Sequence, residues 1–279
     1  MRMKNETAIV TGSTSGIGKK LSELFLREGC KVTICSRNEK KVNNTVSKFQ
    51  EKFGDSVIGE VCDVSDVAAL KRVVAKTFDV FGSIRILVAN AGLNLVYSPF
   101  EHLIQEPEKI KSEMKMMLET NLLGVINSIS TVLPYMTEQG YGRIISVGGG
   151  GGDRPVPNMT LYSASKGGAM AFSKCLATEL KERDDDIKLN IFLPGMIDTN
   201  LEKNVRVIES WKDEETFRQE TSLVLNYLGT DIEKSCSKVI PYVLPTCKAN
   251  GKIFRGFSIM RMIRGGRKFQ KALKEQEKI

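Results

Sequence analysis

Two side chains that could transfer a proton together stand four residues apart in the sequence. Tyr162 and Lys166 occur in the segment Tyr-Ser-Ala-Ser-Lys, within a stretch whose pattern predicts a helix. Residues four apart on a helix share one face, so both side chains would reach the same pocket. A phenol has an ordinary pKa of about 10, and a nearby ammonium lowers that pKa toward the range useful for acid–base chemistry. The competing interpretation is a Tyr and a Lys on a solvated helix face.

A glycine-rich segment near the start of the chain could bind phosphate. Gly12, Gly16 and Gly18 follow a β-branched run and open a helix-like stretch. Glycines at these places allow a tight turn and let the backbone approach a pyrophosphate, while the helix N-terminus offers free N–H groups and a positive dipole end. Because the segment lies between the first strand and the first helix, it predicts cofactor binding in preference to an ordinary glycine turn.

The order of elements indicates how these residues would be positioned. Short β-branched runs alternate with longer amphipathic stretches, and several runs are nearly continuous in apolar residues, as strands covered on both faces should be. The alternation predicts an α/β fold: a Rossmann-type doubly wound parallel sheet of about seven strands, with helices on both faces, in a single domain over residues 1–257. The expected strands are 7–10, 31–35, 56–62, 84–89, 143–147, 188–193 and 252–254. The expected helices lie near 17–27, 39–53, 66–80, 108–137, 163–183 and 231–246.

Five motifs in this order resemble the short-chain dehydrogenase/reductase family. They run from residue 11 to residue 199, and the strand pattern extends the likeness to about residue 257. The glycines have the family's TGxxxGxG spacing rather than GxGxxG. The motifs are Thr11-Gly12 with Gly16 and Gly18, Asn90-Ala91-Gly92, Asn121, Tyr162 with Lys166, and Pro194-Gly195 with Thr199.

This resemblance implies an oxidoreductase that transfers a hydride between a nicotinamide cofactor and a carbonyl or alcohol carbon. In the reducing direction Tyr162 would protonate the carbonyl oxygen. Lys166 would also hold the ribose hydroxyls, and Asn121 would hold a water that links Lys166 to solvent. Asn90 would brace the sheet beside the cofactor, and Asp63 would contact the adenine. The residues expected at the cofactor are Gly12, Ser13, Ser15, Gly16, Ile17, Gly18, Ser36, Arg37, Asn38, Asp63, Val64, Asn90, Ala91, Gly92, Tyr162, Lys166, Pro194, Gly195, Ile197 and Thr199.

The end of the second expected strand indicates which cofactor is used. NAD-specific relatives carry an acidic residue there for the ribose 2′-hydroxyl, whereas this chain has Ser36 followed by Arg37. The missing carboxylate removes a repulsion, and a guanidinium can hold a 2′-phosphate with two hydrogen bonds. NADP(H) is therefore expected. NAD(H) is the alternative, because a surface Arg at a strand end is common by chance.

One position departs from the family pattern. Relatives usually carry a serine 13 residues before the tyrosine, where it donates to the substrate oxygen, and this chain has Gly149 within five consecutive glycines. Losing such a donor commonly costs about 10²–10³ in rate. Three explanations are open: a substitute donor from Ser146, Asn158, Thr160 or a loop N–H, space for a bulky substrate, or a catalytically weakened NADP(H)-binding regulatory protein. A working enzyme is preferred because the other catalytic residues are present, and a serine restored at position 149 should then raise activity on simple ketones.

The substrate class is only partly readable. Residues 200–226 follow the Pro-Gly…Thr motif, where relatives carry a substrate lid, and they include Trp211. Met159, Met196 and Gly149 are also expected at the substrate. These side chains predict an apolar wall, so a lipophilic or bulky ketone is preferred to a sugar.

The net charge of +8 comes from the C-terminal end of the chain. Residues 252–279 contain nine basic and two acidic residues, whereas the other 251 residues contain 32 and 31. A basic segment raises nucleic acid or an anionic membrane as a partner, but the nearly neutral domain shows no basic groove for nucleic acid. The basic tail, 258–279, has only a narrow apolar stripe at Phe269, Leu273 and Gln276. A solvated or subunit-crossing tail is therefore preferred to contact with a membrane surface.

The remaining signals concern location and assembly. No apolar run approaches the roughly 18 residues of a membrane span, and the start lacks the apolar core of a secretory signal, so a cytoplasmic location is expected. The six cysteines show no CxxC spacing and His102 is the only histidine, so reduced thiols and no metal site are expected. Relatives pair through their two long central helices, here near 108–137 and 163–183, so the chain is expected to form a homodimer or homotetramer.

Overall fold

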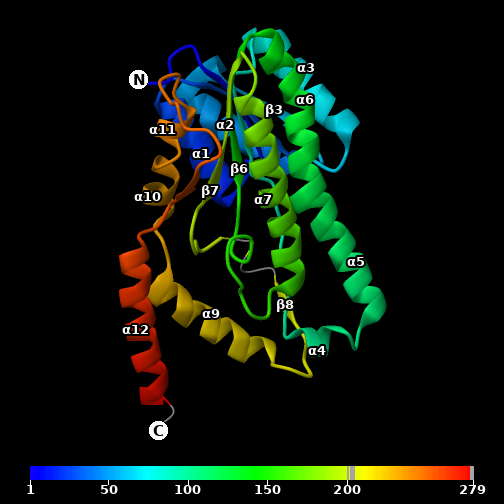
Figure 1. Cartoon of the computed structure of the whole chain (residues 1–279), viewed down its shortest axis with the longest axis vertical. Helices are drawn as coiled ribbons and strands as arrows, with labels where there is room; N and C mark the ends of the chain where they lie inside the picture. The colour runs from blue at the N-terminus through cyan, green and yellow to red at the C-terminus, as the bar shows by residue number, and fades with distance from the viewer. Residues whose placement is uncertain (200, 202–204, 277–279) are drawn as a thin grey trace.

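Seven strands form one parallel sheet (Figure 1). The computed structural model describes residues 1–199, 201 and 205–276, with the backbone alone for 272–276. The strands lie in the order β3-β2-β1-β4-β6-β7-β9, and neighbouring strands are parallel. The predicted α/β fold with a doubly wound parallel sheet is confirmed. The strands are β1 Thr7–Thr11, β2 Lys31–Ser36, β3 Val57–Val61, β4 Ile86–Ala89, β6 Tyr141–Val147, β7 Asp186–Leu193 and β9 Ile253–Arg255.

Helices cover both faces of this sheet because side chains alternate along each strand. On β1, Ile9 belongs to the apolar layer shared with α3, α6 and α7, whereas Ala8 and Val10 belong to the layer shared with α1, α2, α10 and α11. Pro241 lies in the first turn of α11, where proline is tolerated, so two short helices replace the single helix expected near 231–246. The helices are α1 Gly16–Arg27, α2 Glu39–Phe53, α3 Val67–Phe81, α6 Gly124–Glu138, α7 Thr160–Lys181, α10 Ile232–Ser237 and α11 Ile240–Val243, with a short 3-10 turn, Gly54–Ser56, after α2.

The long helix expected near 108–137 is present and contains an irregular turn. α5, Pro107–Leu118, and α6 are joined by a π-helical turn, Glu119–Leu123, and Asn121 lies in that turn. Such turns are frequent at functional sites. By length and composition the stretch Pro107–Glu138 is apolar enough to cross a bilayer, contrary to the expectation that no segment approaches this. In the structure it packs against α3, α7 and β6, as a helix covering a sheet does.

A second layer lies beyond the carboxyl ends of the strands, at the lower end of Figure 1. β5, Val96–Tyr97, and β8, Arg206–Val207, form a two-stranded parallel sheet that the sequence analysis does not predict. α4, Phe100–Leu103, follows β5, and α9, Glu214–Leu228, follows β8. The expected lid over 200–226 therefore includes β8 and most of α9, while its residues 200 and 202–204 lie outside the described residues.

The basic C-terminal segment is helical in its described part. α12, Ile259–Gln276, packs along α9 at the lower end of the molecule, where Figure 1 draws it in red. The rings of Phe269 on α12 and Tyr227 on α9 have centroids 6.2 Å apart. The side chains of Leu273 and Gln276, which complete the stripe noted in the sequence, lie outside the described residues.

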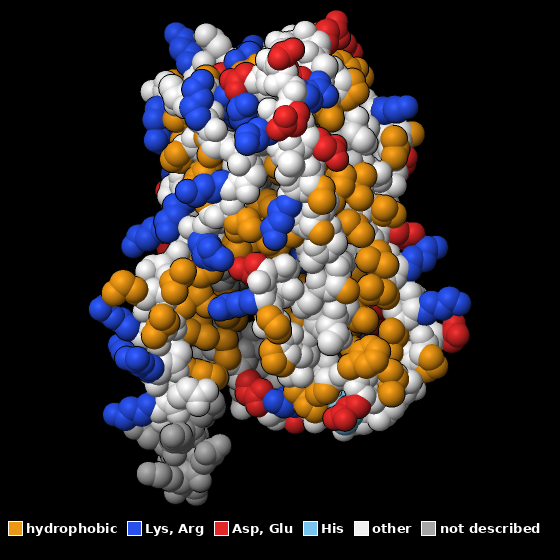
Figure 2. Space-filling view, in the orientation of Figure 1, with side chains coloured by type: hydrophobic (Ala, Val, Ile, Leu, Met, Phe, Trp, Pro, Cys, Tyr) orange, Lys and Arg blue, Asp and Glu red, His pale blue; other side chains and the backbone are white. Residues whose placement is uncertain are grey.

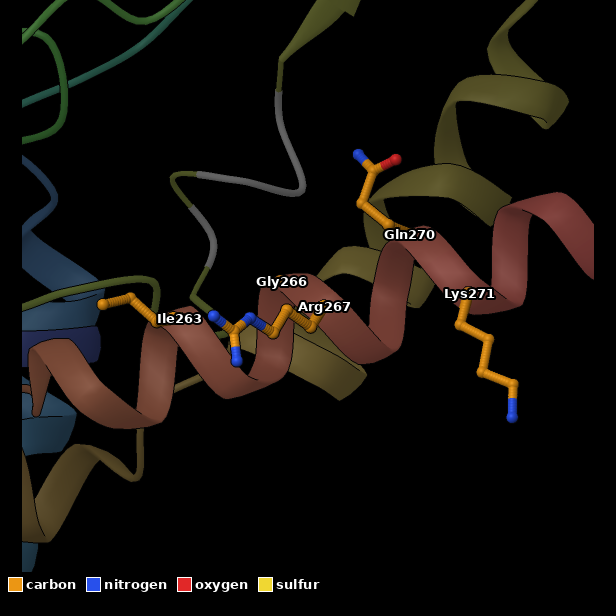
Figure 3. A pocket seen from close by; sticks show the side chains of 5 residues that line it. All are labelled: Ile263, Gly266, Arg267, Gln270 and Lys271. Atoms are coloured by element: carbon orange, nitrogen blue, oxygen red, sulfur yellow. The ribbon is translucent and has the colours of Figure 1, made fainter.

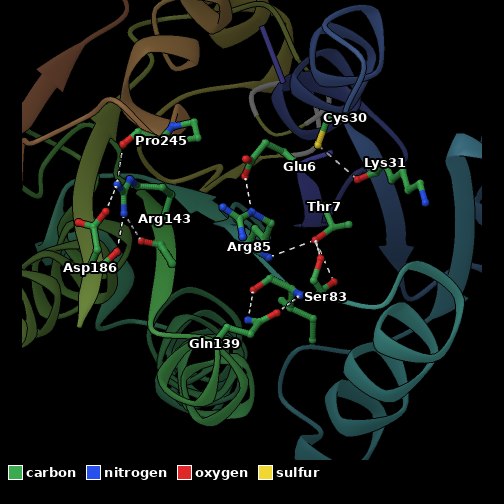
Figure 4. Close-up of polar contacts among 12 residues, drawn as sticks. Glu6, Thr7, Cys30, Lys31, Ser83, Arg85, Gln139, Arg143, Asp186 and Pro245 are labelled. Carbon is green, nitrogen blue, oxygen red and sulfur yellow. Dashed lines mark hydrogen bonds and ion pairs between the residues drawn. The ribbon is translucent and has the colours of Figure 1, made fainter. Parts of the chain in front are cut away.

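Buried polar groups hold the amino ends of the strands together (Figure 4). Arg143 on β6 is fully buried, and its guanidinium donates to Asp186 Oδ2 at 2.7 Å and to the carbonyl oxygen of Pro245 at 3.1 Å. Arg85 Nε donates to Glu6 Oε2 at 3.0 Å. Partial burial raises the pKa of Asp186, but the hydrogen bond and charge of Arg143 hold that pKa below its ordinary value. These contacts stabilise the amino ends of the strands, whereas the motif residues lie at the opposite, carboxyl ends.

Candidate active site

The glycine-rich loop between β1 and α1 has the shape of a phosphate cradle. Gly12 and Gly16 have φ angles of 64° and 51°, which favour glycine. A Cβ on Gly18 would lie 2.5 Å from both Asn90 Nδ2 and the carbonyl oxygen of Gly12, so glycine is needed for α1 to start this close to β4. Ser15 precedes α1 without a capping side-chain hydrogen bond, so the first N–H groups and the positive helix end are available to an anion. The pyrophosphate of a dinucleotide fits this cradle.

Hydrogen bonds from three neighbouring strand ends fix the position of the loop. Asn90 Nδ2 donates to the carbonyl oxygen of Thr11 at 2.8 Å, and the N–H groups of Asn90 and Ala91 donate to Thr11 Oγ1, both at 3.0 Å. The Ser13 hydroxyl is fully buried and accepts from the N–H of Cys35 at 2.9 Å. Ser13 therefore ties the loop to β2, and its contact with a cofactor stays a prediction.

The turn after β2 presents a positive charge to solvent. The Arg37 side chain is 57% exposed, and its Nη1 lies 3.9 Å from Asp63 Oδ2, which is a loose ion pair. Asp63 is held on its own loop by Ser65, whose N–H and hydroxyl donate to Oδ1 at 2.9 and 2.7 Å. Asn38 caps α2 by accepting from the N–H of Lys41 at 2.9 Å. The Arg37 side chain is thus exposed enough to contact a 2′-phosphate on the ribose of a dinucleotide bound at the glycine-rich loop.

The π turn places Asn121 against the loop after β4. Asn121 is fully buried, and its Oδ1 accepts from the N–H of Leu93 at 2.8 Å. Its Nδ2 donates to the carbonyl oxygen of Leu93 at 2.8 Å and to Ser165 Oγ at 2.9 Å. A Cβ on Gly92 would lie 3.2 Å from both Asn121 Oδ1 and Lys166 Nζ. The amide and the ammonium therefore share the space beside Gly92.

Tyr162 and Lys166 both face inward from α7. They are 5% and 3% exposed, so neither lies on a solvated helix face. Lys166 Nζ donates to the carbonyl oxygen of Val147, at the end of β6, at 3.1 Å. Burial lowers the pKa of Lys166 to about 8, because the ammonium loses its hydration. The two side chains whose spacing predicted a shared pocket are brought together at the carboxyl end of the sheet.

Gly149 lies directly against the Tyr162 hydroxyl. A Cβ on Gly149 would come closer than 3.0 Å to that oxygen and within 3.1 Å of Cζ. The tyrosine ring is held in an apolar cluster that includes Met159, one of the residues expected at the substrate wall. The other members of the cluster are Leu93, Leu95, Val96, Leu103, Ile110, Met114, Met117, Leu161 and Ile208.

The segment after β7 lies beside the same edge. The carbonyl oxygen of Pro194 accepts from Ser235 Oγ at 2.7 Å, which fixes the segment to α10. A Cβ on Gly16 would lie 3.3 Å from Thr199 Cγ2, so this segment reaches the glycine loop. The remaining expected cofactor residues lie at or just after the strand ends. Ile17 is in the first turn of α1 and packs on the core, Ser36 ends β2, and Val64 and Ile197 are buried. Gly195 has a φ of 90°.

The contact of Trp211 and Met196 with a substrate stays a prediction, and some supporting residues were not expected from the sequence. The ring of Trp211 packs on Tyr97 at 5.8 Å in the second layer, and the carbonyl oxygen of Met196 accepts from Thr230. Thr11 and Ser165 form hydrogen bonds with Asn90, Ala91 and Asn121. The motifs contain Thr11 and Ser165 but do not single them out. Asn94, only 3% exposed, has no hydrogen-bond partner for either amide atom among the described residues. Within the same residues no three His, Cys, Asp or Glu side chains gather as metal ligands would.

Comparison with known proteins places the whole arrangement in one family. The profile of the short chain dehydrogenases matches residues 6–209. Dehydrogenase/reductase SDR family member 4 of Sus scrofa is 29% identical over 258 residues, which cover 92% of this chain and 86% of that protein. A variant of actinorhodin polyketide ketoreductase solved with NADPH matches 90% of this chain and 95% of its own, with a TM-score of 0.75 and 29% identity. Levodione reductase shares the fold, with a TM-score of 0.80 and 24% identity over 95% of this chain and 98% of its own. The chain belongs to the short-chain dehydrogenase family and is an oxidoreductase.

Proposed function

We propose that the protein is an NADP(H)-dependent oxidoreductase that interconverts a ketone and a secondary alcohol, with Tyr162 as general acid and base. The observation that carries this proposal is the convergence of Tyr162, Lys166 and Asn121, all buried, at the strand ends that also form the phosphate cradle. When bound, the nicotinamide cofactor supplies or takes up the hydride. The protein's own task is to orient the substrate oxygen and move one proton to or from it.

The proton would move at the Tyr162 hydroxyl. In the reducing direction this hydroxyl protonates the substrate oxygen, and a charged Lys166 close to it stabilises the resulting phenolate. The same ammonium can donate to ribose hydroxyls, since Lys166 Nζ lies beside Gly92 at the cofactor edge. Asn121 holds the Leu93 backbone and Ser165, so it keeps the wall beside Lys166 in place.

The preference for NADP(H) rests on Arg37 and on the serine before it. Ser36 ends β2 where a carboxylate would repel a phosphate, and the exposed Arg37 guanidinium can hold one. The structural relative solved with NADPH supports the same preference.

The substrate is proposed to be lipophilic or bulky. The apolar cluster that contains Tyr162 also includes Met159, Leu93 and Leu95. Gly149 occupies the position where we expect the family's serine, so no side-chain hydroxyl is available there to orient the substrate oxygen. A loop N–H or a neighbouring hydroxyl would then take that part.

A homodimer or homotetramer that pairs through the long central helices is part of the proposal. On α5 and the π turn, Met116 and Leu123 are both 45% exposed, and these apolar side chains support a second copy packing there. Light scattering on the purified protein tests this, and a mass of one chain at micromolar concentration would contradict it.

The test of the proposed reaction is a panel of ketones assayed with NADPH and with NADH. We expect NADPH-dependent reduction that Tyr162→Phe abolishes, because the substitution removes only the hydroxyl that donates the proton. Tyr135→Phe is the matched control, since it removes a hydroxyl from a partly buried tyrosine that packs on Phe78, away from the site. Stoichiometric NADPH binding with no turnover on any ketone or alcohol would refute the enzyme and identify a regulatory nucleotide-binding protein.

A further inference from the structure

α12 packs on the protein with one narrow side only. Its contact with α9 is made by Gly265 and Phe269: a Cβ on Gly265 would come within 3.0 Å of Leu228 Cδ2, and the Phe269 ring lies on Tyr227. Phe269 is one turn beyond Gly265, so both lie on the same side of the helix. Most of the other side chains between residues 259 and 271 are exposed.

Three large apolar side chains lie on the uncovered side of α12. Ile259, Met260 and Ile263 are 57%, 64% and 53% exposed, and they fall within five consecutive residues. Exposed apolar side chains scattered singly need no explanation, but a contiguous group of them marks a contact surface. In Figure 2 hydrophobic and basic side chains alternate along the outer edge of the lower-left part, where α12 lies. These three residues precede the narrow apolar stripe at 269–276 that the sequence indicates.

The exposed part of α12 is also strongly basic. Between residues 259 and 271 the sequence has five basic residues and no acidic one. Figure 3 shows Ile263, Arg267, Gln270 and Lys271 projecting from α12 around Gly266, where they line a shallow groove. Arg267 and Lys271, one and two turns after Ile263, therefore lie on the same side of the helix as this apolar residue. The basic residues are Arg261, Arg264, Arg267, Lys268 and Lys271.

The basic surface continues from the base of α12 onto α10. Lys234, Lys238 and Arg261 line one groove there, together with Asp231 and apolar residues such as Met262. Asp231 caps α10 by accepting from the N–H of Lys234 at 2.7 Å, so its carboxylate charge is partly compensated by the end of that helix. Lys234 and Lys238 thus extend the basic surface beside the first turn of α12.

We propose that this surface, formed by residues 259–271 of α12 and by Lys234 and Lys238, docks on an anionic lipid membrane. Apolar side chains beside basic ones match the boundary between acyl chains and negatively charged headgroups, with the long basic side chains reaching the headgroups. Two copies of α12 facing each other would oppose their charges, and a nucleic acid would leave Ile259, Met260 and Ile263 without an apolar environment. The docking is independent of the proposed reaction.

The test is sedimentation of the full-length protein with vesicles. We expect binding to phosphatidylcholine vesicles with about 30% phosphatidylserine at about 0.1 M salt, and at least tenfold weaker binding to pure phosphatidylcholine. Ile263→Asp should weaken the binding at least tenfold. The matched control is Val80→Asp, which changes an equally exposed apolar residue, 53% exposed, on α3. Equal binding by both variants would overturn the proposal, as would failure of the wild type to bind anionic vesicles.

A second pair of variants tests the charges. Arg264→Glu combined with Arg267→Glu should weaken binding at least tenfold, since each cation near an anionic surface is worth about fivefold, whereas Arg72→Glu on exposed α3 should not. Thermal melting checks that each variant is folded. If Ile263→Asp instead converts a larger species to a smaller one in light scattering without lipid, the surface is an interface between copies and the membrane proposal is wrong. Binding of single-stranded DNA that is as tight as vesicle binding and unaffected by Ile263→Asp would also overturn it.

Discussion

Replacing Gly149 with alanine should disable the site by moving one tyrosine. The change adds a single methyl group to the loop after β6, and that methyl would come closer than 3.0 Å to the Tyr162 hydroxyl oxygen and within 3.1 Å of Cζ. Real Cβ atoms essentially never approach other atoms that closely. Because the tyrosine ring is 5% exposed and packed among Met159 and its apolar neighbours, it cannot simply turn into solvent.

The size of the effect follows from this distance. Restoring ordinary contact requires the hydroxyl to move on the order of 1 Å, and a misplacement of that size at a reacting group costs about 10²-fold in rate. Overpacking of a filled core costs roughly 1–3 kcal/mol in the free energy of unfolding. We therefore expect kcat/KM for NADPH-dependent ketone reduction to fall about 10²-fold, with a modest fall in stability.

The assay compares Gly149→Ala with Gly150→Ala. At Gly150 the nearest atom to an added Cβ is Val156 Cγ2 at 3.7 Å, which is ordinary contact, so this control adds the same methyl to the same loop without touching Tyr162. Ketone reduction, NADPH affinity and thermal melting are measured for both variants. Equal activity in the two would refute the argument that Gly149 makes room for the Tyr162 hydroxyl in the proposed reaction.

Gly149→Ser separates this crowding from the missing hydrogen-bond donor. The sequence alone predicts a gain of activity on simple ketones. The structure predicts in addition that the serine Cβ displaces the Tyr162 hydroxyl, as the alanine Cβ does, and that this lowers the rate. If the donor matters, the serine variant should be more active than the alanine variant by up to about 10²-fold, even if both fall below the wild type.

Three further predictions concern charges. Burial lowers the pKa of Lys166 from 10.5 to about 8, so the unfolded chain binds more protons between these pH values. The cost of burying the charged ammonium is therefore complete below pH 8 and fades as the pH rises to 10.5. Lys166→Met should exceed the wild type in free energy of unfolding by roughly 3 kcal/mol at pH 7, and a difference that does not change with pH would contradict this. Arg37→Ala should raise KM for NADPH about tenfold and leave KM for NADH unchanged, with Arg72→Ala as control; a parallel change for both cofactors would exclude a 2′-phosphate contact. Arg143→Met should lower the free energy of unfolding by about 2 kcal/mol in urea titration without changing KM for NADPH, and a changed KM would show that the two ends of the sheet are coupled.

The sheet and the convergence of motifs were predictable because both follow from local patterns. A run such as Arg143-Ile-Ile-Ser-Val147 is long enough and apolar enough for a strand buried on both faces. In a parallel sheet the carboxyl ends of strands share one edge. Motifs placed just after separate strands, such as Gly12 and Asn90, must therefore meet, as their hydrogen bonds show. The two-stranded sheet of β5 and β8 was not predictable, since each strand is only two residues long.

The contact between Gly149 and Tyr162 was not predictable because it depends on how a loop folds over a helix. The sequence marks Gly149 only as the position where a serine is expected. That marking suggests a lost donor, and the structure shows in addition that the tyrosine hydroxyl fills the space a side chain would need. Similarly, the sequence does not show that three apolar residues at the start of α12 are exposed. Their exposure depends on α9 packing against another side of that helix.

Burial also decides between the two interpretations that the spacing of Tyr162 and Lys166 allowed. Four-residue spacing places two side chains on one helix face but does not say whether that face meets solvent or the sheet. α7 covers the sheet, and the face that carries Tyr162, Ser165 and Lys166 is the buried one. An ammonium in such a place lowers the stability of the fold, so its presence has to be explained by something other than packing. The reduced pKa of Lys166 is thus an argument for function that the sequence could not supply, and it comes from the same burial that brings the tyrosine hydroxyl to Gly149.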